Sequence, residues 1–137
     1  MPDEAAPEGR ITGGKPWSDR YTYWPARRAG NLLFISGTTG TDDAGNITAP
    51  GDIVEQTRQV FRKWAPLLEE AGCTFDDIVQ TVDHFTTTEN YRGTAAVRRE
   101  FFKRGMPTST GVLVSGLLRP DALIEIHAIA VIPDAAR

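Results

Sequence analysis

The strand predicted over residues 123–132 constrains the fold of this chain more than any other segment. Its side chains alternate between two faces. One face places Glu125 and His127 side by side in an otherwise hydrophobic strand. An ionised carboxylate is costly to bury without a partner or water, so this face is expected to line a pocket, a subunit interface or a wetted groove. The opposite face is a continuous apolar stripe that must cover a core: Ile124, Ile126, Ala128, Ala130 and Ile132.

Strand and helix signals alternate along the rest of the chain. Residues 118–122 (LRPDA) have turn chemistry and separate the last strand from another that begins at residue 108. Further strands are predicted over residues 20–26, 31–37 and 76–86, where β-branched, aromatic and other apolar side chains gather.

Two helices are predicted between these strands. The first begins at Asp52, which has capping-box spacing to Glu55, and ends before Gly72. Pro66 interrupts its apolar pattern and predicts a kink. The second helix is expected to begin at residues 87–88 and to end before Gly105.

This order of elements predicts an α+β fold, with one sheet and two helices on one of its faces. The other face of the sheet is left uncovered, and a monomer rarely exposes so much apolar surface. Self-association is the simplest remedy. The side chains expected on this uncovered face are Val82, Val112, Val114, Ile129 and Val131.

A length of 137 residues fits one domain, here residues 20–137, preceded by an N-terminal tail over residues 1–19. The net charge is −3, with both signs spread along the chain, which argues against a nucleic-acid partner. No apolar run has membrane-spanning length, and the start of the chain lacks a signal-peptide pattern. The single Cys73 cannot form an internal disulfide, so a cytoplasmic protein is expected.

Candidate functional side chains are few. Glu125 and His127 suit general acid–base chemistry, and they suit equally an interface salt bridge with an arginine of a neighbouring subunit. His84 shares their face and could complete a set of three metal ligands, but nothing in the sequence fixes the three in one place. We therefore predict neither a metal nor a cofactor. Neither Ser36 nor Ser109 has a recognisable histidine partner, so both are interpreted as hydrogen-bonding groups.

Several segments, taken in order, resemble the Rid family, the YjgF-type reactive enamine/imine deaminases. The likeness runs from about Tyr23 to Val131, and its most specific part is the stretch IEIHAIAV at residues 124–131. The other segments are Gly30-Asn31, Phe34-Ile35-Ser36-Gly37, Gln56-Thr57, Ala71-Gly72 and Phe101-Phe102.

The resemblance implies a chorismate-mutase-like α+β fold in which three subunits pack their uncovered sheet faces into a central barrel. Three clefts would then lie between neighbouring subunits. Members of this family hydrolyse enamines and imines of small metabolites to ketones and release ammonia. By position, Glu125 corresponds to the glutamate that positions water, while Tyr23 and Ser36 correspond to residues that bind substrate. His127 stands where the deaminases more often carry an acid, and we predict that His127 and Ser109 also bind substrate.

One departure concerns Ser109, which stands two residues after Pro107, where the amino-acid-imine deaminases have an arginine that clamps the substrate carboxylate. Serine cannot form that bidentate pair. The resemblance therefore implies an altered substrate, such as an aminomuconate-type ring-cleavage product. Two alternatives stay open: a non-catalytic trimer that binds a metabolite or protein, and another cleft reaction such as chorismate hydrolysis. Candidates to replace the missing clamp are Arg27, Arg28, Arg98 and Arg119.

Overall fold

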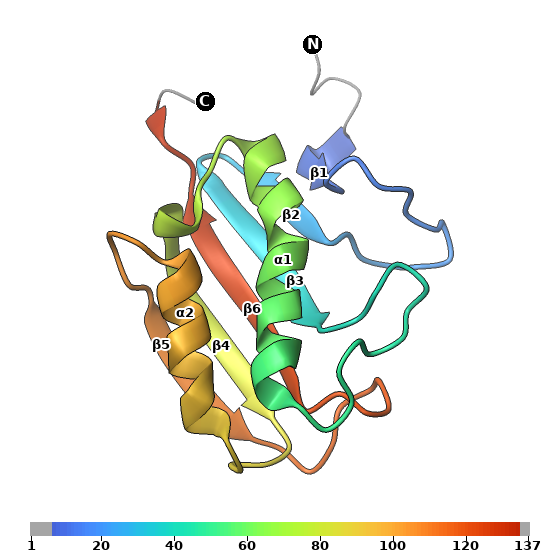
Figure 1. The fold of residues 1–137 in the computed structure, drawn as a ribbon. Coiled ribbons are helices and arrows are strands. Elements are labelled where there is room, and N and C mark those ends of the chain that lie inside the picture. The colour runs from blue at the N-terminus through green and yellow to red at the C-terminus, as the bar shows by residue number, and fades with distance from the viewer. Residues whose placement is uncertain (1–6, 135–137) are drawn as a thin grey trace.

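The computed structural model describes residues 7–134, and in it six strands form one sheet in the order β1-β2-β3-β6-β4-β5. Helices α1 (Ile53–Ala71) and α2 (Thr94–Phe101) both lie on the same face of the sheet (Figure 1). This confirms the predicted α+β fold. The strands are β1 (Arg10–Ile11), β2 (Ala26–Ala29), β3 (Leu32–Thr39), β4 (Ile78–Phe85), β5 (Thr108–Leu113) and β6 (Ile124–Val131).

Helix α1 has the ends that its sequence predicts. The Asp52 side chain accepts a hydrogen bond from the backbone N–H of Glu55, and Gly72 ends the helix in the left-handed conformation at φ 78°. The helix continues through Pro66 as one element. Its buried stripe packs on the sheet through Ile53, Gln56, Thr57, Val60, Phe61, Trp64, Leu67, Leu68 and Ala71.

Helix α2 begins later than predicted, at Thr94 instead of residues 87–88. The hydroxyl of Thr87 accepts a hydrogen bond from the backbone N–H of Glu89, which holds this stretch in a local turn. Asn90 then takes a left-handed conformation at φ 61°, and a single 3-10 turn over Tyr91–Gly93 leads into the helix. This side-chain hydrogen bond stabilises a turn, although the same residues had suggested the start of a helix.

The predicted strand over residues 20–26 is wrong, because after β1 the chain rejoins the sheet only at Ala26. Pro25 has no backbone N–H to donate to a neighbouring strand. The aromatic rings before it pack against each other instead of on a sheet: the ring centroids of Trp17 and Tyr21 lie 4.7 Å apart, and those of Tyr21 and Tyr23 lie 5.6 Å apart.

The segment predicted as a tail is partly built into the domain. Strand β1 pairs with β2, and Ile11 is buried. Residues 1–6 of the predicted tail, and residues 135–137 of the predicted domain, lie outside the described residues. Part of the N-terminal segment thus extends the sheet at its β2 edge.

The turn predicted at residues 118–122 is present, with the backbone N–H of Ala122 donating to the carbonyl of Arg119. The strands on its two sides are not neighbours, however. Within the described part of the chain, β5 pairs with β4 alone, in parallel, and forms one edge of the sheet, while β6 lies between β3 and β4. A parallel pair needs a crossover, and α2 supplies it between β4 and β5.

On β4, the side chains of Thr81, Asp83 and Phe85 are buried on the helix side. Val79, by contrast, is 45% exposed, and the register with β6 shifts between Ile78 and Gln80. The buried Asp83 is fully partnered. Its carboxylate accepts from Arg98 Nη2 at 2.7 and 2.9 Å and from the Tyr91 hydroxyl at 2.7 Å. We call Asp83, Tyr91 and Arg98 the closed cluster.

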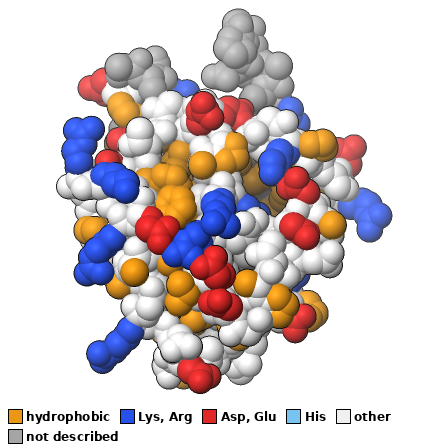
Figure 2. All heavy atoms as spheres, in the orientation of Figure 1, with side chains coloured by type: hydrophobic (Ala, Val, Ile, Leu, Met, Phe, Trp, Pro, Cys, Tyr) orange, Lys and Arg blue, Asp and Glu red, His pale blue; other side chains and the backbone are white. Residues whose placement is uncertain are grey.

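No helix of residues 7–134 covers the other face of the sheet (Figure 1), and we call it the open face. Phe34 is 41% exposed there, and Val112 and Val131 are exposed as well. By contrast, the helix side carries interspersed side chains of both charges over its surface (Figure 2). None of the helices in the described part of the chain is long and apolar enough to cross a membrane.

Candidate functional site

A cavity of about 490 Å³ opens where the end of β3, the start of β6 and two loops meet. It brings together Tyr23, Ser36 and Glu125, three of the residues predicted from the sequence. We call it the Glu125 cavity. Its full lining is Tyr23, Ser36, Gly37, Thr39, Leu118, Arg119, Pro120 and Glu125.

Glu125 lies on the open face of β6, across from Thr39 of β3 and His84 of β4. Gly37 leaves room for it, since a Cβ at that position would overlap the Glu125 carboxylate. The glycine therefore allows a charged group to lie directly against the backbone of β3. Among the described residues, none donates a hydrogen bond to this carboxylate and none forms an ion pair with it.

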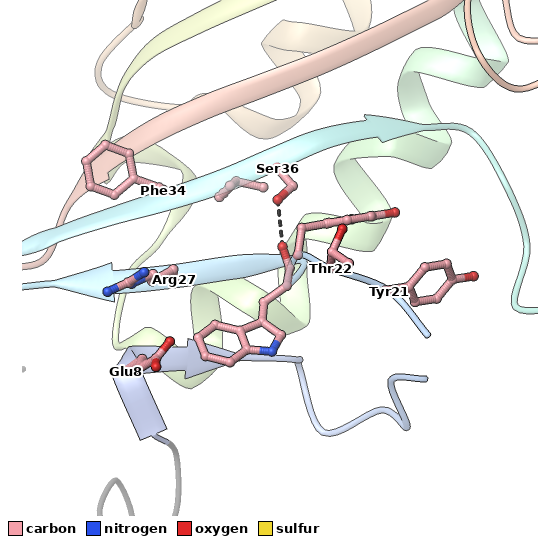
Figure 3. Close-up of a pocket in the computed structure, with 9 residues that line it drawn as sticks. Glu8, Tyr21, Thr22, Arg27, Phe34 and Ser36 are labelled. Atoms are coloured by element: carbon pink, nitrogen blue, oxygen red, sulfur yellow. Dashed lines mark hydrogen bonds between the residues drawn. The ribbon is translucent and has the colours of Figure 1, made fainter. Parts of the chain in front are cut away.

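Ser36 lies where the register between β3 and β6 shifts, and it anchors the loop that precedes β2. Its hydroxyl donates to the carbonyl of Trp24 at 2.6 Å (Figure 3), and its backbone N–H donates to the carbonyl of Pro25 at 2.9 Å. The hydroxyl proton is therefore used in a hydrogen bond within the protein. The oxygen lone pairs of Ser36 stay available to a donor in the cavity.

Tyr23 reaches the Glu125 cavity from that anchored loop, with its side chain about half exposed. Trp17 holds the loop from the other side. Its indole Nε1 donates to the carbonyl of Tyr23 at 2.7 Å, and its ring meets the Tyr23 ring edge-on at 5.5 Å. Trp17 was missed because it fell in the predicted tail, although the density of aromatic residues between positions 17 and 24 was a usable signal.

The structure does not bring His127 or Ser109 to this cavity within one chain. His127 lies farther along the open face of β6, where its ring stacks on that of His84 at 5.7 Å. Ser109 is paired in register with Thr81, whose side chain is buried under the helices, so Ser109 lies on the opposite face of the sheet from Glu125. No three potential metal-ligating side chains of the described residues gather into a metal site.

The four arginines proposed as replacements for the missing clamp are separated by the structure. Arg98 is committed to the closed cluster, and Arg28 donates from Nε to the carbonyl of Gly30 at 3.3 Å. Arg27 lines a different cavity of about 500 Å³, together with Glu8, Tyr21, Phe34 and Ser36 (Figure 3). Arg119 is the one of the four that lines the Glu125 cavity.

Comparison with known proteins agrees with this geometry. A family model described as endoribonuclease L-PSP matches residues 16–132. The chain belongs to this family, the YjgF or Rid family. A RutC family protein of Pyrococcus horikoshii is 36% identical over 108 residues, which cover 79% of this chain and 85% of that protein.

Solved structures of the Rid family show the same fold. YyfA of Yersinia pestis, a protein of unknown function in the conserved Rid family, is 32% identical, with a TM-score of 0.77 over 88% of this chain and 95% of that one. A Mycobacterium tuberculosis member of the YjgF/YER057c/UK114 family is 31% identical, with a TM-score of 0.74 over 90% of this chain and 98% of that one. Membership supports a role in small-molecule deamination or binding.

Proposed function

We propose that this Rid family member is an enamine/imine deaminase-like hydrolase that acts on a small metabolite in the Glu125 cavity. The observation that carries the proposal is the carboxylate of Glu125, which lines a cavity beside Tyr23 and Ser36 and has no donor among the described residues. A carboxylate left free in this way can hold a water molecule and accept its proton.

In the proposed reaction, water held by Glu125 attacks the carbon of the C=N bond and passes a proton to the carboxylate. Glu125 returns that proton to the nitrogen, which gives a carbinolamine. The carboxylate then takes the proton of the new hydroxyl group and passes it to the amino nitrogen as the C–N bond breaks, so that the products are a ketone and ammonia. The Ser36 oxygen can accept a hydrogen bond from the substrate nitrogen, because its own proton is donated to Trp24. Tyr23 forms an aromatic wall of the cavity.

Ammonia release tests this assignment. We expect Glu125→Gln to lower the rate at least about tenfold, given the range of roughly 10²–10⁴ for positioned acid–base groups. Glu69→Gln, at an exposed position of α1, is the matched control and should keep the wild-type rate. Full activity in a folded Glu125→Gln variant would instead assign the carboxylate a structural role. If the wild type releases no ammonia from any imine or enamine yet binds such compounds, the non-catalytic alternative is favoured.

The active form is proposed to be a homotrimer in which the open faces form a central barrel. Exposed apolar side chains on that face support self-association, and the number three rests on the resemblance to the Rid family. Native mass spectrometry should give a trimer mass for the wild type and for Ala65→Asp on the exposed side of α1. Val131→Asp on the open face should give smaller species. A monomeric wild type at micromolar concentration would contradict the barrel.

A further inference from the structure

A second cavity of about 260 Å³ adjoins the Glu125 cavity. The two share Tyr23, Ser36, Gly37, Thr39 and Arg119 as walls. The second cavity extends to Lys63, which projects from α1, and we call it the Lys63 cavity. A ligand that occupies both cavities would have one end near Glu125 and the other near Lys63.

Lys63 is held at the wall of this cavity by two hydrogen bonds. Its ammonium donates to the carbonyl of Thr39 at 2.9 Å and to the hydroxyl of Thr41 at 2.6 Å. An ammonium has three N–H donors, so these two contacts leave one available. Desolvation by burial lowers the pKa of Lys63 to about 8, and the positive charges of Arg119 and Lys15 act in the same direction.

The cavity has charged walls, yet Lys63 and Arg119 have no counter-ion among the described residues. Of the two nearby carboxylates, Asp43 pairs with Lys15 at 2.9 Å. The other, Asp42, accepts from the backbone N–H groups of Ala44 and Asn46 in its own turn.

Arg119 is fixed between the two cavities. Its Nη1 donates to the carbonyl of Gly45 at 2.8 Å, a contact that joins the loop before β6 to the loop after β3. One N–H of a guanidinium is used in this way, and the remaining donors are free to bind a planar anion. Lys63 is partly buried, whereas Arg119 is exposed. A partly buried ammonium without a counter-ion is costly unless water or a ligand supplies a partner.

We propose that the Lys63 cavity binds a carboxylate at one end of the ligand, with Lys63 and Arg119 as its partners. The substrate class follows if the proposed function holds: an elongated acid with its carboxylate remote from the C=N bond at Glu125. This differs from a small 2-imino acid, whose carboxylate is attached to the reacting carbon. Ser109, at the place of the family's arginine, lines neither cavity.

Binding of unreactive acids tests the site without turnover. Succinate should bind the wild type at pH 7, and its neutral diamide, succinamide, should bind at least about tenfold more weakly, since charge-assisted hydrogen bonds contribute most of the difference. Lys63→Met and Arg119→Gln should each weaken succinate binding about tenfold or more. Lys103→Met is the matched control, because Lys103 is an exposed lysine that lines neither cavity. The succinate affinity of this variant should change by less than about threefold.

The pH dependence separates a charge effect from a structural one. The charged side chains that face Lys63 are Arg119, Lys15, Asp42 and Asp43, and burial lowers the pKa of Lys63 itself to about 8. Succinate binding by the wild type should therefore weaken as the pH rises above about 8. Lys63→Arg keeps its charge and should still bind at pH 9.5. This variant also preserves the test if Lys63→Met does not fold.

Three results would overturn the proposal: equal affinity for succinamide, unchanged succinate affinity in folded Lys63→Met and Arg119→Gln, or preference for inorganic phosphate over succinate. Each is distinct from failure of the proposed function. Succinate binding with no ammonia release from any imine would leave the carboxylate site in place and remove the hydrolase. Ammonia release together with unchanged acid binding in the Lys63 and Arg119 variants would keep the hydrolase and remove the carboxylate site.

Discussion

The closed cluster and the two adjoining cavities hold charged side chains in opposite ways. Asp83 is almost completely buried, and both of its oxygens accept hydrogen bonds from Arg98 or Tyr91. Glu125 and Lys63 are only partly buried, and no opposite charge pairs with either among the described residues. In the closed cluster, residues of the protein itself neutralise the buried charge. In the two cavities, the charged side chains need water or a ligand as a partner.

Whether a charged side chain is paired within the protein distinguishes structural from functional charges better than its residue type does. A buried ion pair adds little net stability over an apolar pair, but removing one partner is strongly destabilising. An unpaired and partly desolvated charge, by contrast, lowers stability while it is present. Removing a charge from the closed cluster should therefore lower the free energy of unfolding, whereas removing an unpaired charge from the cavities should leave it nearly unchanged or raise it. The predictions below test this from the largest expected effect to the smallest.

Arg98→Met should give the largest loss. It leaves the Asp83 carboxylate buried with only the Tyr91 hydroxyl as a strong donor, so we expect a loss of about 3–5 kcal/mol in the free energy of unfolding. Chemical denaturation at fixed protein concentration measures it. Arg104→Met is the matched control, since the Arg104 side chain is 90% exposed and lies 4.0 Å from Asp76. A loss below about 1 kcal/mol for Arg98→Met would remove the distinction between the two regions.

Lys63→Met should act in the opposite direction. The pKa of Lys63 is lowered in the folded state, so the unfolded state binds the proton more tightly. The resulting penalty is complete below about pH 8 and disappears by about pH 10.5, which means that wild-type stability rises across this window. Methionine has no such penalty. The stability of wild type relative to Lys63→Met should therefore increase by about 1–3 kcal/mol as the pH rises.

Unfolding curves of both proteins between pH 7 and 10.5 check this expectation. The difference between the two proteins is the quantity to compare, because other groups titrate in the same range. One of them is Cys73, whose pKa is raised to about 11 by burial. The exposed Lys103 again provides the control variant, Lys103→Met. A difference that stays constant with pH would mean that Lys63 is solvated like an ordinary surface lysine.

The elements that sequence predicted well are those whose signals are local. The ends of α1 follow from Asp52 and Gly72, and the alternation on β6 follows from the period of two residues. The start of α2 was wrong because side chains of the preceding turn compete with the helix for backbone hydrogen bonds. That β6 lies between β3 and β4 could not be predicted, because strand order depends on contacts between distant segments.

The candidate site shows the same division. Glu125 was found because a charge on an apolar strand is conspicuous, and the family resemblance pointed to Tyr23 and Ser36. The nearness of Lys63 and Arg119 to them is tertiary information, since α1 and the loop before β6 are distant in sequence. Asp83 shows the converse error that sequence alone invites. Its charge is as conspicuous as that of Glu125, yet only the structure shows that Arg98 neutralises it.

Asp52→Ala tests an intermediate case, a carboxylate that is partnered but exposed. The Asp52 side chain accepts the backbone N–H of Glu55 at 3.0 Å at the start of α1. Loss of an N-cap typically costs about 1 kcal/mol, and water can replace part of the lost bond. Asp52→Asn, which keeps the acceptor, is the matched control and should lose clearly less stability. If Asp52→Ala were as damaging as Arg98→Met, exposure would not explain the difference between the two regions.

Glu125→Gln should have the smallest effect on stability, although it has a large expected effect on ammonia release. Glutamine keeps the shape of the side chain, and no described residue loses a hydrogen bond or an ion pair when the charge is removed. We expect a change within about 0.5 kcal/mol in the free energy of unfolding, as for an ordinary surface substitution. Thermal and chemical unfolding at matched protein concentration provide the measurement. A loss of several kcal/mol would show that the carboxylate is held by contacts with a neighbouring copy of the chain, and Glu125 would then belong with Asp83 among the structural charges.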